Sequence, residues 1–219
     1  MAKIPVYLMP GLAASSAIFE RIQLDEAIFE IHLLEWEIPN QRETLLSYAK
    51  RMASRIEKEN VVLVGVSFGG VLVQEMAAFL KVRKLIIISS VKTNLEVPLR
   101  MKIIKSTKAY KLVPTTLLQN IEILNNFSFG NAIQQRLKLY EKYLSVRNKT
   151  YLDWAIEQMV LWDRTKPDKS VIQIHGDADE VFPIKNIKDC IIVKGGTHIM
   201  ILSKYRWMNE NLPKIILNE

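Results

Sequence analysis

Short apolar runs recur along this chain of 219 residues, and helix-compatible segments separate several of them. Each run is too brief for a helix and is bounded by turn-forming or charged residues, so each predicts a strand. The run at 61–64 is continuous and mostly β-branched, which is typical of a central parallel strand covered on both faces. Short strands alternating with helices predict βαβ units and a parallel sheet. The runs are 4–9, 28–36, 61–64, 84–88, 171–174 and 191–193.

The segments between the runs predict helices and one long insertion. Residues 42–58 place apolar side chains at helical spacing among charges, which indicates an amphipathic helix, and residues 71–80 contain almost no helix breakers. Residues 92–165 are long, charged and helix-compatible, without a convincing strand. We therefore predict an α/β fold with a mostly parallel sheet and helices on both faces. Its core comprises residues 1–91 and 166–219, and residues 92–165 form a helical insertion.

Most of the formal net charge of +7 lies in the insertion, which carries twelve Lys or Arg residues against six Asp or Glu residues. Lys102, Lys105, Lys108 and Lys111 recur every third residue, roughly on one side of a helix. We favour an ordinary solvated face; the alternative is a basic face that steers an anionic substrate or an acidic surface toward the site. The row lacks interleaved aromatic residues and a recognised nucleic-acid module, so nucleic-acid binding is not predicted.

Cysteine usage and hydropathy bear on the compartment. The single cysteine, Cys190, cannot form an internal disulfide, and the first residues have neither a long apolar core nor a small-residue cleavage site. No apolar run reaches the roughly 18 residues that a membrane-spanning helix requires. We expect a soluble, cytoplasmic protein without a membrane span.

The segment Gly65-Val66-Ser67-Phe68-Gly69-Gly70 lies where a predicted buried strand ends and a helix begins. A serine on such a sharp turn has strained backbone geometry, and glycines two residues to either side avoid side-chain collisions. Phe68 starts the helix, so its N–H lacks an intrahelical acceptor and can point at an oxyanion beside Ser67. A turn that serves packing alone is the alternative reading of this segment.

A serine nucleophile needs a base, and the chain has three histidines. His32 lies in an apolar strand, where a structural role is expected, and His175 ends a strand with an undefined side-chain direction. His198 lies in the loop after the last strand, at the same carboxyl edge of the sheet as Ser67. Asp177 and Asp179 follow the preceding strand, and either could orient the histidine.

The order Ser67, Asp179, His198 and the strand-turn-helix around Ser67 resemble the α/β-hydrolase superfamily across nearly the whole chain. The family pattern Gly-x-x-Asp-x-x-x-Pro fits Gly176, Asp179 and Pro183, which favours Asp179 and keeps Asp177 as the fallback. The resemblance implies six strands, because two amino-terminal strands of larger relatives are missing, and a helical cap at residues 92–165. It also implies an oxyanion N–H after Met9-Pro10-Gly11, which we assign to Leu12 beside that of Phe68, although Pro10 replaces the usual histidine.

The resemblance implies a serine hydrolase that cleaves a carboxylic ester or thioester through an acyl-enzyme, with no metal or organic cofactor. Alternatives are a noncatalytic ligand-binding or scaffold protein, and an acyltransferase or carbon–carbon hydrolase using the same triad. Trp154, Met159 and Trp162 recur within the insertion; we favour ordinary packing, and the alternative is that they line the substrate pocket with Met200.

Overall fold

The sheet defines the architecture. The structure, a computed structural model, describes residues 2–112, 115 and 142–218. Within these residues, six strands form one sheet in the order β2-β1-β3-β4-β5-β6, and every pairing is parallel. The predicted parallel sheet of six strands is confirmed. The strands are β1 Ile4–Met9, β2 Phe29–Leu33, β3 Val61–Val66, β4 Val82–Ile88, β5 Val171–Gly176 and β6 Ile191–Val193.

The second predicted strand is too long. Residues 28–36 were expected to be extended, but β2 pairs with β1 alone, and this pairing ends at Leu8 and Leu33. The chain then turns inward, and the Trp36 ring stacks on Phe68 at a centroid distance of 5.2 Å. Burial of this aromatic surface explains why the strand stops early.

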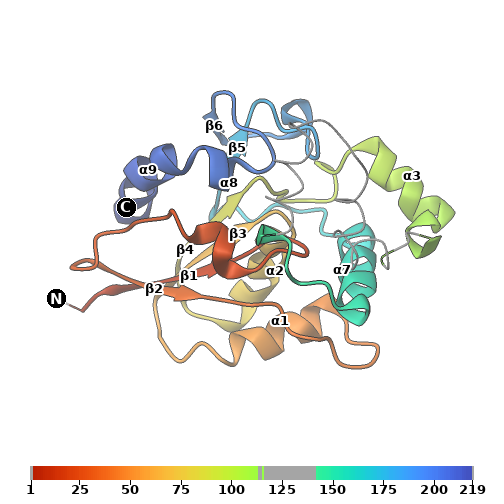
Figure 1. The fold of residues 1–219 in the computed structure, drawn as a ribbon, viewed down its shortest axis with the longest axis horizontal. Coiled ribbons are helices and arrows are strands. Elements are labelled where there is room, and N and C mark those ends of the chain that lie inside the picture. Colours follow the sequence, from red (N-terminus) through yellow and green to blue (C-terminus); the bar gives the residue numbers. More distant parts are fainter. Residues whose placement is uncertain (1, 113–114, 116–141, 219) are drawn as a thin grey trace.

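Helices α1, α2 and α7 cover one face of the sheet. They span Leu45–Ala53, Phe68–Met76 and Lys149–Leu161, and a short 3₁₀ turn, η2, follows α2 at Ala77–Phe79. Thr44 caps α1 by accepting a hydrogen bond from the N–H of Ser47, so the helix begins at Leu45, three residues beyond the start of the predicted segment 42–58. Figure 1 shows α1 and α2 together on this side of the strands. Their side chains join one core cluster with those of Leu63 and Ile87.

Helices α8 and α9 and the 3₁₀ turn η1 cover the opposite face, as Figure 1 shows for α8 and α9. They span Met200–Ser203, Tyr205–Leu217 and Ser16–Phe19. A second core cluster on this face contains Val62, Val64 and Val66 of β3. Because successive strand residues point to opposite faces, β3 supplies side chains to both clusters, and the prediction of helices on both faces is confirmed.

The chain between β4 and β5 contributes α3 Leu99–Thr107, η3 Ala109–Leu112 and α7. The described part of this segment contains helices and no strand, in agreement with the predicted insertion. Residues 113–114 and 116–141 lie outside the described residues, so the division into a core and a cap stays a prediction. Among the described residues, no helix is both long and apolar enough to span a membrane.

The topology brings four loops to one edge of the sheet. Strand β1 lies between β2 and β3, so the chain order reverses between β1 and β3, the usual location of a ligand site in an open α/β sheet. Met9 pairs with Gly65 there, and the loops after β1 and β3 leave the sheet side by side. The loops after β5 and β6 reach the same edge because all strands run parallel. They carry Asp179 and His198.

Candidate active site

Ser67 lies in the turn between β3 and α2. Its backbone has φ 53° and ψ −121°, a strained conformation for a residue that carries a side chain. Two hydrogen bonds hold this backbone from the neighbouring strand: the Ser67 N–H donates to the Ile88 carbonyl at 2.9 Å, and the Ser90 hydroxyl donates to the Ser67 carbonyl at 2.6 Å. The end of β4 therefore fixes the geometry of the turn.

Two glycines make this turn sterically possible. A Cβ atom on Gly65 would overlap the backbone of Gly69, and a Cβ atom on Gly69 would overlap the carbonyl oxygens of Met9 and Pro10. The sequence-based reason for these glycines is confirmed. Gly69 also lets the start of α2 lie directly against the loop that follows β1.

His198 lies within hydrogen-bonding distance of Ser67. Its Nε2 is 3.0 Å from Ser67 Oγ, and its Nδ1 is 2.9 Å from Asp179 Oδ2. A neutral imidazole that donates its Nδ1–H to Asp179 leaves Nε2 to accept the serine proton. The Phe182 ring packs edge-on against the imidazole at 5.4 Å. The structure thus brings together the three residues that the sequence singled out.

Asp179 is buried, and its two oxygens have separate partners. Oδ2 faces His198, while Oδ1 accepts hydrogen bonds from the N–H groups of Val181 and Phe182 at 2.8 and 2.9 Å. Burial alone raises the pKa of this carboxyl group. The hydrogen bond and charge of His198, together with the Phe182 N–H, outweigh burial and hold the pKa of Asp179 below its ordinary value.

The neighbouring candidates have other contacts. Asp177 is exposed, and its Oδ1 accepts a hydrogen bond from the Gly195 N–H at 2.6 Å, which ties together the loops after β5 and β6. His175 is fully buried; its Nε2 lies 2.8 Å from the Phe182 carbonyl and 3.5 Å from Asp179 Oδ2. His175 therefore supports the loop that carries Asp179 from its buried side. Its end-of-strand position beside Gly176 was visible in the sequence, but the direction of its side chain was not.

Two backbone N–H groups beside Ser67 have no acceptor. No hydrogen bond within the described part of the chain uses the N–H of Leu12 or of Phe68. Gly11 lies so close to Ser67 that a Cβ atom on it would be 3.4 Å from Ser67 Cβ. The N–H groups of both predicted donors thus have no acceptor among the described residues, and Gly11 and Phe68 lie directly beside Ser67.

The loop that carries Leu12 is held by residues that sequence reasoning missed. Trp36 Nε1 donates to the Gly11 carbonyl at 2.8 Å, and the Ala13 N–H donates to the hydroxyl of buried Tyr151 at 3.3 Å. Ala13 itself has φ 64°. Tyr151 comes from α7, 138 residues away in the chain, and nothing in the local sequence indicates this contact.

A cavity of about 220 Å³ opens beside the nucleophile. Ser67, His198, Gly11 and Leu12 all contribute to its lining. It lies on the face covered by η1 and α8. A ligand in this cavity is in contact with the proposed nucleophile and base.

The four residues named as pocket candidates lie elsewhere, which corrects that alternative. Trp154 packs among Tyr48, Phe68 and Tyr151 on the opposite face, while Met159 and Trp162 border a separate hollow beside α3. Met200, the first residue of α8, is fully buried in the core of the face that α8 covers. All four side chains pack against other residues. The favoured interpretation of ordinary packing therefore holds for Trp154, Met159 and Trp162.

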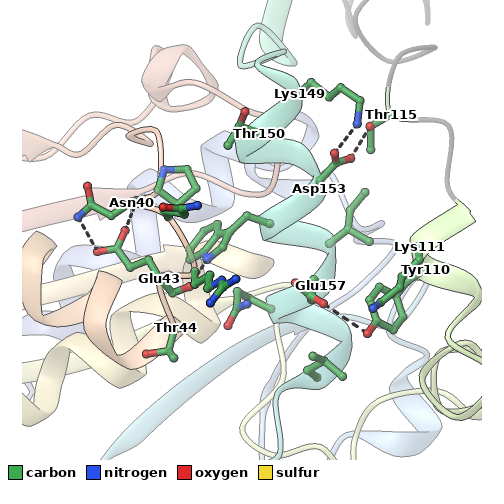
Figure 2. A pocket seen from close by; sticks show the side chains of 17 residues that line it. Asn40, Glu43, Thr44, Tyr110, Lys111, Thr115, Lys149, Thr150, Asp153 and Glu157 are labelled. Atoms are coloured by element: carbon green, nitrogen blue, oxygen red, sulfur yellow. Dashed lines mark hydrogen bonds and ion pairs between the residues drawn. The ribbon is translucent and has the colours of Figure 1, made fainter.

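A separate hollow of about 1010 Å³ lies between α7, η3 and the loop at residues 39–44, and Ser67, Asp179 and His198 are not among its described lining residues. Figure 2 shows its carboxylates turned toward partners: Asp153 faces Lys149 and Thr115, and Glu157 faces Tyr110. Within the described residues, no cluster of His, Cys, Asp and Glu is suited to a metal ion.

The lysine row of the insertion does not reach the Ser67 cavity. None of Lys102, Lys105, Lys108 and Lys111 belongs to the described lining. Two of them donate to backbone carbonyls, Lys102 to Leu95 at 3.3 Å and Lys105 to Leu161 at 3.1 Å. The steering role stays a hypothesis, and these contacts agree with the ordinary solvated face.

Comparison with known proteins identifies the fold. No protein-family model and no curated protein sequence matches the chain. Among solved structures, a hydrolase from Pseudomonas aeruginosa PA01 superposes with a TM-score of 0.71 at 14% identity, covering 99% of this chain and 91% of that one. An esterase from Exiguobacterium antarcticum gives 0.66 at 17% identity, with 99% and 93% covered. A thermophilic esterase from Thermogutta terrifontis gives 0.67 at 13% identity, with 98% and 90% covered. The chain has the α/β-hydrolase fold.

Proposed function

We propose that the protein is a serine hydrolase that cleaves a carboxylic ester or thioester through an acyl-enzyme intermediate. The observation that carries the proposal is the continuous chain of contacts from the Ser67 hydroxyl to the His198 imidazole and on to the buried Asp179 carboxylate. The solved structures of similar fold that are described as esterases support the same class of reaction.

In the first half of the reaction, His198 Nε2 removes the Ser67 proton as the serine oxygen attacks the substrate carbonyl carbon. Asp179 stabilises the imidazolium that forms, and its lowered pKa keeps it ionised at neutral pH. The N–H groups of Leu12 and Phe68 donate to the oxyanion, and each such donor contributes on the order of 10²- to 10³-fold in rate. His198 then gives its proton to the departing alcohol or thiol.

In the second half, water attacks the acyl-enzyme. His198 takes a proton from this water and returns it to Ser67 as the carboxylic acid leaves. The strained Ser67 backbone and its bonds to β4 keep the serine oxygen in place through both halves.

The test joins covalent labelling with turnover. A fluorophosphonate probe should label the wild-type protein at Ser67, and p-nitrophenyl esters should be hydrolysed. Ser67→Ala should abolish labelling and lower kcat by on the order of 10⁶-fold.

Ser89→Ala is a matched control, because Ser89 directly follows the adjacent strand β4, also has a positive φ of 49°, and is fully buried. This variant should keep its labelling and turnover. Absence of labelling in the wild-type protein would instead favour a noncatalytic binding protein, and turnover that survives Ser67→Ala would place the activity elsewhere.

A further inference from the structure

The walls of the Ser67 cavity are apolar. They include Ala14, Ile18, Tyr143, Leu144, Ile201 and Leu202. Among the described lining residues, no side chain is an acid, a lysine or an arginine. The Tyr143 hydroxyl is already engaged, since it donates to Glu20 Oε1 at 2.6 Å. Of the lining residues that the structure describes, Ser67 and His198 have polar side chains available to a ligand.

This distribution of polarity suits one part of an ester in particular. A carbonyl group must reach Ser67 and the N–H groups of Leu12 and Phe68, and whatever is attached to it and enters the cavity meets hydrocarbon. A charged group there would lose its hydration without gaining a partner. The cavity therefore favours a neutral, apolar substituent.

The volume sets the approximate size of that substituent. An apolar protein cavity of about 150 Å³ holds a benzene molecule, which has six carbons. The cavity beside Ser67, at about 220 Å³, is half as large again. It has room for a chain of up to about eight carbons.

We infer that this cavity binds the acyl group of the substrate, and that the substrate is an ester or thioester of a neutral, straight-chain fatty acid of short to medium length, about four to eight carbons. The inference rests on the proposed function and specifies its substrate class. Leu202 is a specificity-determining residue in this assignment. It lies on α8, lines the cavity and is partly exposed, so its replacement leaves the fully buried core unchanged.

The experiment measures kcat/KM for p-nitrophenyl esters from acetyl to dodecanoyl. In the wild-type protein, kcat/KM should rise by roughly fourfold per added methylene while the chain fills the cavity. It should reach its maximum between butanoyl and octanoyl and fall by dodecanoyl. A succinyl monoester, which matches butanoyl in chain length but carries a charge, should be at least tenfold poorer than the butanoyl ester.

Variants at Leu202 then move the optimum in opposite directions. Leu202→Trp narrows the cavity and should shift the optimum toward shorter chains by two carbons or more, while Leu202→Ala should shift it toward longer chains. Leu217→Trp and Leu217→Ala are the matched controls, because Leu217 is partly exposed at the end of α9 and outside the cavity. They should leave the profile unchanged.

The outcomes separate this inference from the proposed function. If Ser67-dependent hydrolysis occurs but the wild-type protein prefers dodecanoyl or succinyl esters, the acyl assignment is wrong, and this result needs no folded variant. It is equally wrong if both Leu202 variants keep the wild-type profile. If no ester is hydrolysed and the probe does not label Ser67, the proposed function itself fails.

Discussion

The two faces of the sheet differ sharply where they meet Ser67. On the face of α1, α2 and α7, the Phe68 ring contacts the rings of Trp36 and Trp154, and the hydrogen bonds of Trp36 and Tyr151 fix the loop before Ala14. On the face of η1 and α8, the cavity of about 220 Å³ is lined mostly by aliphatic side chains, with Tyr143 among them. A hollow lined by apolar side chains with a few polar groups has the usual composition of a small-molecule site.

This contrast suggests that the faces have separate tasks. In the proposed mechanism, the aromatic face holds the N–H groups of Leu12 and Phe68 in position, and the largely aliphatic face would receive the substrate. Asp179 contacts residues of both faces. It accepts a hydrogen bond from the N–H of Phe182, which belongs to the core of the aromatic face, and it faces His198, which lines the cavity. Variants on the aromatic face should therefore affect rate more than chain-length preference.

The largest effect is expected for Asp179→Asn, at the residue between the two faces. An amide in place of the carboxylate removes the charge that stabilises the imidazolium and permits the wrong histidine tautomer, so kcat should fall by on the order of 10⁴-fold. The acyl-chain profile of the residual activity should match that of the wild type. A changed profile would show that the contact between Asp179 and His198 also determines the shape of the cavity.

The same variant should alter how stability depends on pH. Folding lowers the pKa of Asp179, so its ionised form stabilises the fold above the unfolded pKa of about 3.9, and this contribution is lost as pH falls through the lower folded value. The difference in Tm between the wild type and Asp179→Asn should be largest above about pH 5 and shrink toward pH 2. A difference that stays constant over this range, measured by thermal unfolding, would contradict the lowered pKa.

A smaller effect is expected for Tyr151→Phe, which tests the aromatic face as a positioning element. The substitution keeps the ring and leaves the Ala13 N–H buried without its acceptor. The loop that carries Leu12 (the oxyanion loop) should become more mobile. We therefore expect kcat to fall roughly tenfold, which is less than the ~10²-fold expected for complete loss of an oxyanion donor. KM should change little. Affinity for an alkyl boronic acid, whose tetrahedral adduct places an oxygen at these donors, should fall by the same factor as kcat.

Tyr48→Phe is the matched control for this prediction. Tyr48 is fully buried beside Trp154, and its hydroxyl accepts from the Glu37 N–H at 2.8 Å, away from the oxyanion loop. Both substitutions should lower stability, and Tyr151→Phe alone should lower kcat and boronate affinity. Equal losses in the two variants would reduce Tyr151 to a purely structural role.

The smallest effect is expected for Ser90→Ala, which removes the hydroxyl that holds the Ser67 carbonyl. That carbonyl keeps its bond from the Gly70 N–H at 2.9 Å, so the fold should lose about 1 kcal/mol, a decrease in Tm of about 2–4 °C. Ser106→Ala removes a similar hydroxyl-to-carbonyl bond from an exposed helix and should change Tm by less. The Tm of each variant is measured by calorimetry. A larger decrease for Ser90→Ala than for Ser106→Ala would show that the Ser90 hydroxyl stabilises the strained turn, and equal decreases would contradict this.

The sheet was predictable because its strands are short apolar runs with defined ends. The first and last runs, 4–9 and 191–193, match β1 and β6 residue for residue, whereas β3 runs two residues beyond 64 because Gly65 and Val66 pair with Ile87 and Ile88. Local composition cannot show how far a neighbour continues to pair. The end of β2 was mispredicted for a related reason, since it depends on where Trp36 packs.

The triad residues were recognisable because each follows a strand, and parallel strands direct their following loops to one edge. The cavity was not, because its walls come from η1, α8 and residues 143 and 144, which approach one another only in the folded chain. Trp154 and Met200 look suitable for a pocket in the sequence, but both are used in packing. An apolar residue at helical spacing indicates burial, and it does not indicate which side of the sheet holds a ligand.

The separation of 131 residues between Ser67 and His198 has a consequence during synthesis. A nascent chain can complete the turn around Ser67 early, yet it lacks Asp179 and His198 until the loops after β5 and β6 have been synthesised. Such long-range contacts also form late in folding, because the intervening chain must be ordered first. A chain that ends before β6 therefore lacks the contact between Ser67 and His198, which forms only once the loop after this strand packs at the edge of the sheet.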